Sequence, residues 1–126
     1  MRLLVLGDSR LLAWTAGRLS PPGTEIVGVA SLDDAMRALV ETPPDAAIVN
    51  LPSSRVAWRD FQRLCVSRVP PVPVLYVSTA LTSAEEAGLE SAAGYAALLR
   101  APARPGEMES AIETLFAAAR EARASG

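Results

Sequence analysis

The stretch "RLLVLGDS" (Arg2–Ser9) decides the fold, because a continuous apolar run, Leu3–Leu6, ends abruptly in Gly7-Asp8-Ser9. A strand with one wet face alternates apolar and polar residues, whereas an unbroken run is typical of a parallel strand covered on both faces. The residues after the run carry the chemistry. Ser9 suggests a nucleophile, Gly7 a nucleotide-binding turn, and Asp8 the acidic corner of a pocket.

The same alternation continues along the chain. Apolar runs at 24–30, 45–50, 73–78 and 95–99 follow the first one at 2–6, and helical patterns occupy 9–19, 31–41, 55–68, 82–94 and 105–122. Ser9 and Ser31 are suited to cap the first two helices. Proline pairs stand just ahead of three of the strands, where they end the preceding helix. Five strand–helix units predict an α/β fold: a single-domain, doubly wound (βα)5 sandwich with a five-stranded parallel sheet.

Length and composition limit the possibilities further. The 126 residues are expected to form one domain over 1–122, with a frayed tail at 123–126. Aromatic residues make up 5% of the chain, so the predicted core is mainly aliphatic, and a net charge of -2 argues against nucleic-acid binding through this domain. No apolar run is long enough to span a membrane. The single cysteine, Cys65, allows no internal disulfide and suits a reducing cytoplasm, where we expect it to be a buried, inert thiol.

The chain has no histidine, and all 12 of its basic residues are arginine. A hydrolase triad around Ser9 would need a histidine base, so the esterase interpretation fails. A dinucleotide site would need G-x-G-x-x-G after the first strand, and "GDSRLL" supplies only Gly7. A nucleotide-binding, Rossmann-like domain therefore stays a minor alternative.

Ligands in open α/β sheets bind beyond the carboxyl ends of the strands. Polar and special residues follow several of these predicted ends, namely Gly7, Asp8, Asn50, Ser78, Thr79, Arg100, Ala101 and Pro102. Of these, the candidate pocket comprises Asp8, Asn50, Ser78, Thr79, Ala101 and Pro102.

The chain resembles a response-regulator receiver domain over essentially its whole length. The resemblance lies in the order of the predicted strands and helices, in the lengths of the loops and in the residues at the strand ends. That resemblance implies a flavodoxin-like strand order of 2-1-3-4-5. It also implies a pocket that holds Mg²⁺ and a phospho-accepting aspartate at the end of the third strand. "PDAAIVN" (44–50) carries the family's Pro-Asp pair at the expected offset, and Ser78 matches the family's hydroxyl position.

The departures from the family pattern lie in the reactive groups. Asn50 occupies the acceptor position, Gly7-Asp8 stands where two acids are usual, and Ala101-Pro102 replaces Lys-Pro. A neutral amide cannot form an acyl phosphate, one carboxylate binds Mg²⁺ poorly, and alanine cannot neutralise a phosphoryl group. The sequence therefore predicts a pseudo-receiver that is not an enzyme and holds no cofactor or metal.

Two further sets of residues are candidates for signalling. The family's aromatic switch position aligns with Leu98, or with Tyr95 in a shifted alignment. Surfaces for a protein partner are suggested by an apolar stripe on the last helix and by arginines and a tryptophan on the third, namely Ile112, Leu115, Phe116, Trp58, Arg55 and Arg59. Receiver domains often dimerise through their fourth helix, fifth strand and fifth helix, so the resemblance implies a homodimer as one option.

These observations favour a phosphorylation-independent signalling domain that binds another protein or a second copy of itself. The alternative is a small-ligand sensor that uses the vacated acidic pocket, and a third possibility is a receiver with residual activity.

Overall fold

A computed structural model of the chain describes residues 1–7, 10–50, 58–68, 71–78, 95–100 and 104–125. Its elements in chain order are β1 (Arg2–Leu6), α1 (Arg10–Leu19), β2 (Glu25–Val29), α2 (Leu32–Glu41), β3 (Ala46–Asn50), α3 (Trp58–Ser67), β4 (Val74–Ser78), β5 (Tyr95–Arg100) and α4 (Pro105–Ser125). The helix predicted at 82–94 and the cap predicted at Ser9 lie outside the described residues. No helix in the described ranges has the length and apolarity needed to cross a bilayer.

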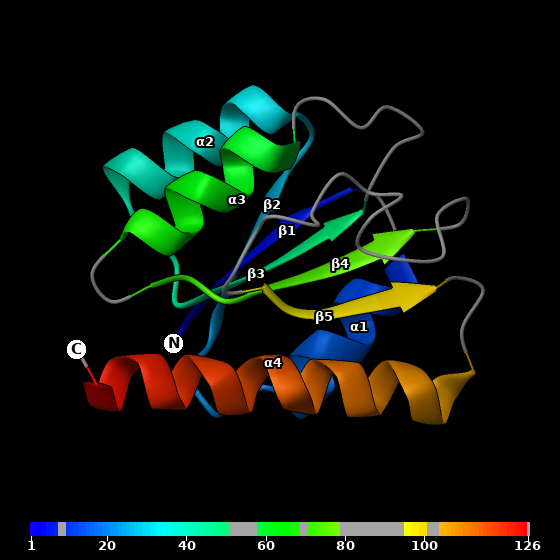
Figure 1. The fold of residues 1–126 in the computed structure, drawn as a ribbon. Helices are drawn as coiled ribbons and strands as arrows, with labels where there is room; N and C mark the ends of the chain where they lie inside the picture. Colours follow the sequence, from blue (N-terminus) through cyan, green and yellow to red (C-terminus); the bar gives the residue numbers. More distant parts are fainter. Residues whose placement is uncertain (8–9, 51–57, 69–70, 79–94, 101–103, 126) are drawn as a thin grey trace.

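The strands form one parallel sheet in the order β2-β1-β3-β4-β5, which is the order the resemblance implied. Helices α2 and α3 lie together over one face of the sheet, and α1 and α4 lie over the other (Figure 1). The doubly wound α/β architecture is therefore confirmed for the described part of the chain. Burial on both faces explains why the polar residues Arg2, Asn50 and Ser78 stand only at the ends of β1, β3 and β4, outside the buried runs between them.

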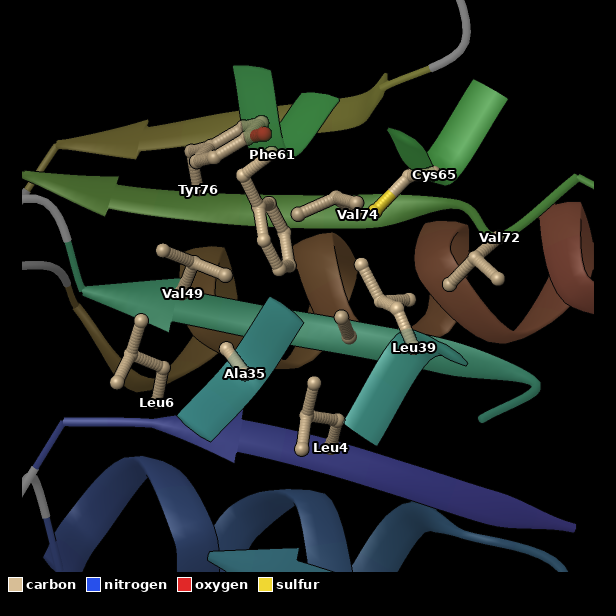
Figure 2. Packing of buried hydrophobic residues seen from close by; sticks show 11 residues of the cluster. Leu4, Leu6, Ala35, Leu39, Val49, Phe61, Cys65, Val72, Val74 and Tyr76 are labelled. Atoms are coloured by element: carbon tan, nitrogen blue, oxygen red, sulfur yellow. The ribbon is translucent and has the colours of Figure 1, made fainter. Parts of the chain in front are cut away.

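Alternate side chains of the three central strands enter two separate cores. On the α2 and α3 side, Leu4 and Leu6 of β1 pack with Leu39, Phe61 and other buried residues (Figure 2). On the α1 and α4 side, the intervening β1 residues pack against the long helix, in a cluster that contains Leu3, Val5, Ala16, Ile48, Leu75, Ile112, Leu115 and Phe116. The two-residue period of a strand thus supplies both layers at once.

The placement of Ile112, Leu115 and Phe116 corrects the prediction that they form a partner interface. Their exposed fractions are 0%, 0% and 3%, because the apolar stripe of α4 lies against the sheet within this single chain. The apolar face of an amphipathic helix can pack against only one surface, and the apolar face of α4 packs against the sheet. These three side chains are therefore not available to a partner.

The carboxylate of Asp45 ties β1, β3 and α4 together at the amino end of the sheet. Its Oδ2 accepts a hydrogen bond of 2.7 Å from the backbone N–H of Arg2, and its own N–H donates to the Arg2 carbonyl at 2.8 Å. Arg123 Nε lies 3.8 Å from Asp45 Oδ1. α4 continues to Ser125, so residues 123–125 of the predicted tail are part of this helix. Arg123 in the last turn also complements the helix dipole.

Polar side chains cap one helix and join two others. Ser31 caps α2, because its hydroxyl accepts a 3.1 Å hydrogen bond from the N–H of Asp34, as predicted from the sequence. Arg18 near the end of α1 forms an ion pair with Glu109 of α4, which joins the two helices on their face of the sheet.

One polar pair lies inside the core beneath α3. The hydroxyl of Tyr76 on β4 donates a 2.7 Å hydrogen bond to Oε1 of Gln62 on α3, and both side chains have an exposed fraction of 0%. A buried acceptor that loses its donor costs free energy, whereas removing both partners together costs less than the sum of the single changes. This bond therefore fixes how α3 sits on β4.

Tyr76→Phe is expected to lower the free energy of unfolding by about 1–3 kcal/mol, because the Gln62 carbonyl loses a donor in a dry site. Urea denaturation followed by circular dichroism measures the loss. The double variant Tyr76→Phe/Gln62→Met is expected to lose less than the two single variants added together. Strict additivity of the two single losses would contradict an energetic coupling between these side chains.

Candidate functional site

The candidate pocket lies at the carboxyl edge of the sheet, where the parallel strands end side by side. Leu6 of β1 is in register with Val49 of β3, so the chain positions that follow them, Gly7 and Asn50, are neighbours at this edge. Asn50 is itself in register with Val77 of β4. The backbone thus brings the ends of β1, β3 and β4 together, as the sequence predicted.

The other strand ends complete this edge. Ser78, the last residue of β4, is in register with Arg100, the last residue of β5. Thus two of the predicted pocket residues, Asn50 and Ser78, stand at the ends of adjacent strands. The predicted pocket residues Asp8, Thr79, Ala101 and Pro102 lie outside the described residues.

Gly7 has a backbone conformation that a carboxylate-bearing residue would adopt only with strain. Its φ is 119°, in the region that favours glycine, and its N–H donates to the Val29 carbonyl at 3.4 Å. Position 7 is where the receiver pattern carries an additional acid. The replacement therefore involves the path of the chain and not only the side chain, which the sequence alone did not reveal.

The donor chemistry at this edge does not fit a magnesium site. Mg²⁺ prefers several anionic oxygens in octahedral geometry. By residue type, the predicted pocket positions offer one carboxylate, that of Asp8, and the neutral amide of Asn50. Within the part of the chain that the structure describes, no cluster of three or more cysteine, aspartate or glutamate residues is arranged to hold a metal ion.

The two candidate switch positions are on β5. Tyr95 is in register with Val74 and Leu98 with Tyr76, with a register irregularity between Val74 and Leu75. Leu98 therefore neighbours, on the backbone of the sheet, the tyrosine that is hydrogen-bonded to α3. This proximity was not visible in the sequence, since it depends on the irregular register.

The basic stripe predicted on the third helix is only partly described. Trp58 and Arg59 lie in the first turn of α3, and Arg55 lies outside the described residues. Arg63, one turn further along the helix, is exposed, and its Nη1 lies 3.8 Å from Oδ1 of Asp60. An exposed pair at this distance contributes little to stability. The use of this stripe by a partner stays a prediction.

Cys65 is the single cysteine of the chain, and its buried environment makes the thiol unreactive. Its side chain is fully buried in the core beneath α3, and burial raises the pKa of the thiol from 9.0 to about 12. Burial also raises the pKa of the neighbouring Tyr76 phenol, with repulsion from a charged Cys65 as the second cause. A thiol that stays protonated at neutral pH is a poor nucleophile. The predicted burial of Cys65 is confirmed, and its lack of reactivity stays a prediction.

Comparison with known proteins identifies relatives by structure only. The sequence matches no family model and no curated protein. The signal receiver domain of a Vibrio parahaemolyticus protein described as a Luxo repressor superposes with a TM-score of 0.72 and 19% identity, over 99% of this chain and 97% of that one. A Sinorhizobium meliloti 1021 protein described as the CpaE2 pilus assembly protein gives 0.67 and 15%, over 92% and 100%.

A third solved structure supports the same assignment of fold. The signal receiver domain of a modulated diguanylate cyclase from Desulfovibrio desulfuricans G20 superposes with a TM-score of 0.66 and 19% identity, over 99% of this chain and 98% of that one. Likeness at this level of identity concerns the fold. Over nearly its whole length, the chain therefore has a receiver-like α/β fold.

Gly7→Ala is expected to lower the free energy of unfolding by about 1–3 kcal/mol, because a side chain at this φ strains the backbone. Thermal and urea denaturation measure the change. Gly106→Ala is the matched control: it lies in α4 with open space around its Cβ position, so alanine is expected to leave stability unchanged or raise it. Equal effects of the two substitutions would contradict the assigned strain.

Stability is expected to fall as pH rises above about 9, and Cys65 is one cause. Between its ordinary pKa of 9.0 and its raised value of about 12, the thiol loses its proton only in the unfolded chain. The unfolded state then binds fewer protons than the folded state, so the free energy of unfolding decreases by up to about 1.4 kcal/mol per pH unit. Urea titrations at pH 8 and pH 10.5 should show a smaller decrease for Cys65→Val. Identical pH dependence in both proteins would rule out the thiol as a contributor.

Proposed function

We propose that this chain is a pseudo-receiver: a signalling domain that acts through protein–protein contacts and does not accept a phosphoryl group. The single observation that carries this proposal is Asn50, at the carboxyl end of β3, in register with Val77 and beside the end of β1. This is where the receiver resemblance expects the phospho-accepting aspartate.

The chemistry of phosphoryl transfer supports the proposal. An acceptor carboxylate attacks phosphorus with an anionic oxygen, and the donor's leaving group departs as the acyl phosphate forms. The asparagine amide is neutral, and its oxygen cannot form a stable acyl phosphate. Charge on a transferring phosphoryl group also requires a cation or metal nearby. Ala101 replaces the family's lysine, and the chain contains no lysine at all.

The backbone at Gly7 gives independent support. Its φ of 119° favours glycine over aspartate. A single substitution could leave a receiver partly active, but the pocket departs at three positions together: 7, 50 and 101. What the fold retains is a rigid scaffold with surfaces for partners. The solved relatives described as signal receiver domains fit a regulatory role for such a scaffold.

Incubation with acetyl phosphate and Mg²⁺ is expected to give no phosphoryl adduct on this chain, because position 50 lacks a carboxylate. Intact-mass spectrometry reads the adduct, and tryptophan fluorescence with beryllofluoride reads any conformational response. An active receiver domain treated in parallel is the positive control.

Asn50→Asp is the matched variant, since it restores the carboxylate on the same scaffold. Labelling of Asn50→Asp but not of the natural chain would assign the loss to this position. A phosphoryl group mapped by fragmentation to the carboxyl edge of the natural chain would overturn the proposal.

A further inference from the structure

The strand β2 has one edge that no described element covers. It lies at the end of the sheet and pairs only with β1 (Figure 1). The N–H of Glu25 donates to the Met1 carbonyl at 2.9 Å, and the Val29 carbonyl accepts from Gly7 at 3.4 Å. Residues 25, 27 and 29 therefore direct their backbone groups toward β1. By alternation, Ile26 and Gly28 direct their N–H and C=O groups toward the free edge.

Within the described residues, few of the usual devices that prevent strand pairing protect this edge. Such devices are very short strands, charged side chains, prolines, bulges or a covering element, and β2 is a short strand of five residues. β2 reads "EIVGV", so its one charge is Glu25 at the amino end. Arg2 NH2 lies 3.1 Å from the Glu25 carboxylate and balances that charge. The rest of the strand is apolar, and Ile26 is 40% exposed.

The free edge is complementary to itself in one antiparallel register. A twofold axis at Val27 would place Ile26 opposite Gly28 of a second copy, and Gly28 opposite the second Ile26. All of these residues present both backbone groups outward, so each of the two opposed pairs would exchange two hydrogen bonds. Val27 would face its own copy in the intervening pair without hydrogen bonds, where side chains approach most closely.

Side chains fit this register on the α1 face of the sheet. A Cβ added at Gly28 would meet nothing within 4 Å, so there is an open notch beside the strand. The isoleucine opposite would cover that notch from each copy, which is a stabilising cross-strand arrangement. Ile26 already rests on α1, since its Cδ1 lies 3.4 Å from the Cβ position of Gly17. One turn earlier on the same helix, Trp14 is 64% exposed and extends the apolar surface.

The opposite face of β2 is also open to a partner. A groove of about 400 Å³ lies beside β2 and α2, and its lining combines apolar residues such as Leu4 and Val27 with charged ones such as Asp34 and Arg37. The Val27 side chain of a second copy would reach the mouth of this groove. The charges permit this approach, because Glu25 would lie opposite Val29 and about 13 Å along the strand from the second Glu25. A net charge of -2 adds little repulsion.

We propose that β2 pairs antiparallel with β2 of a second copy, about a twofold axis at Val27, so that one sheet continues across both chains. The inference rests on the proposed role in protein–protein contact and names the partner as a second copy of this chain. An unrelated strand could use the same backbone groups, but only an identical strand puts isoleucine against the glycine notch on both sides. Twofold pairing also closes the edge of both copies at once.

Val27→Cys is expected to form a disulfide-linked dimer under mild oxidation, because the two Cβ atoms of this pair would lie about 4.5–5.5 Å apart, within reach of a disulfide after a small adjustment. Glu25→Cys is the matched control, since it is on the same strand and face and is more exposed, yet its copy would be four residues away. Buried Cys65 provides a low background. Non-reducing electrophoresis reads the product. Absence of the Val27→Cys dimer, or equal cross-linking of Glu25→Cys, would overturn the pairing.

A charge test separates pairing from damage to the fold. Sedimentation of the natural chain over a range of concentrations is expected to show dimers, whereas Val27→Lys and Val27→Glu alone are expected to be monomers. Mixing the two variants should restore dimers, since opposite charges would meet at the axis. A monomeric natural chain, or no recovery on mixing, sinks the proposal. Phosphoryl labelling does not depend on oligomeric state, so failure here is distinguishable from failure of the proposed function.

Discussion

Burial of the central strands on both faces is the constraint on which the rest of the structure depends. β1, β3 and β4 each send alternate side chains into two cores, one beneath α2 and α3 and one against α1 and α4. A strand covered twice must be apolar along its length and must be followed by a helix that can cross over the sheet. The parallel direction follows from that crossover. In turn, it gathers every strand's carboxyl end at one edge and every amino end at the other.

The two edges of the sheet have different roles. At the amino edge, Asp45 of the Pro-Asp pair binds the backbone of Arg2 and faces Arg123, so the motif's carboxylate is structural. At the carboxyl edge, the positions where a receiver would carry reactive acids hold Gly7 and Asn50. The contacts that maintain the fold are thus separate from the groups that would perform chemistry. The Asp45 contacts that support the fold therefore do not depend on which residue stands at position 50.

The same separation governs where a partner can bind. The apolar face of α4 is buried against the sheet of the same chain. Residues on the outward face of that helix, such as Glu113 and Arg120, are polar. Among the described residues, large apolar side chains are exposed at Ile26 of β2 and Trp14 of α1, and also at Val40 of α2 and Val66 of α3. β2 is an edge strand of the sheet, so the outward N–H and C=O groups of Ile26 and Gly28 pair with no other described strand. These groups favour a partner that supplies an extended strand.

The sequence by itself determined the order of the elements, since apolar runs and helical periodicity predicted β1 at Arg2–Leu6 and the other described strands to within a residue or so. It also determined which residue types stand at positions 50 and 101, an asparagine and an alanine where the receiver resemblance expects an aspartate and a lysine. Only the tertiary structure decided that Ile112 and Phe116 are core residues, since an apolar stripe looks the same whether it meets a sheet or a partner. It likewise decided the Tyr76–Gln62 bond and the outward direction of the Ile26 and Gly28 backbone groups. Each of these depends on which strand is the neighbour and in which register, and that information is non-local.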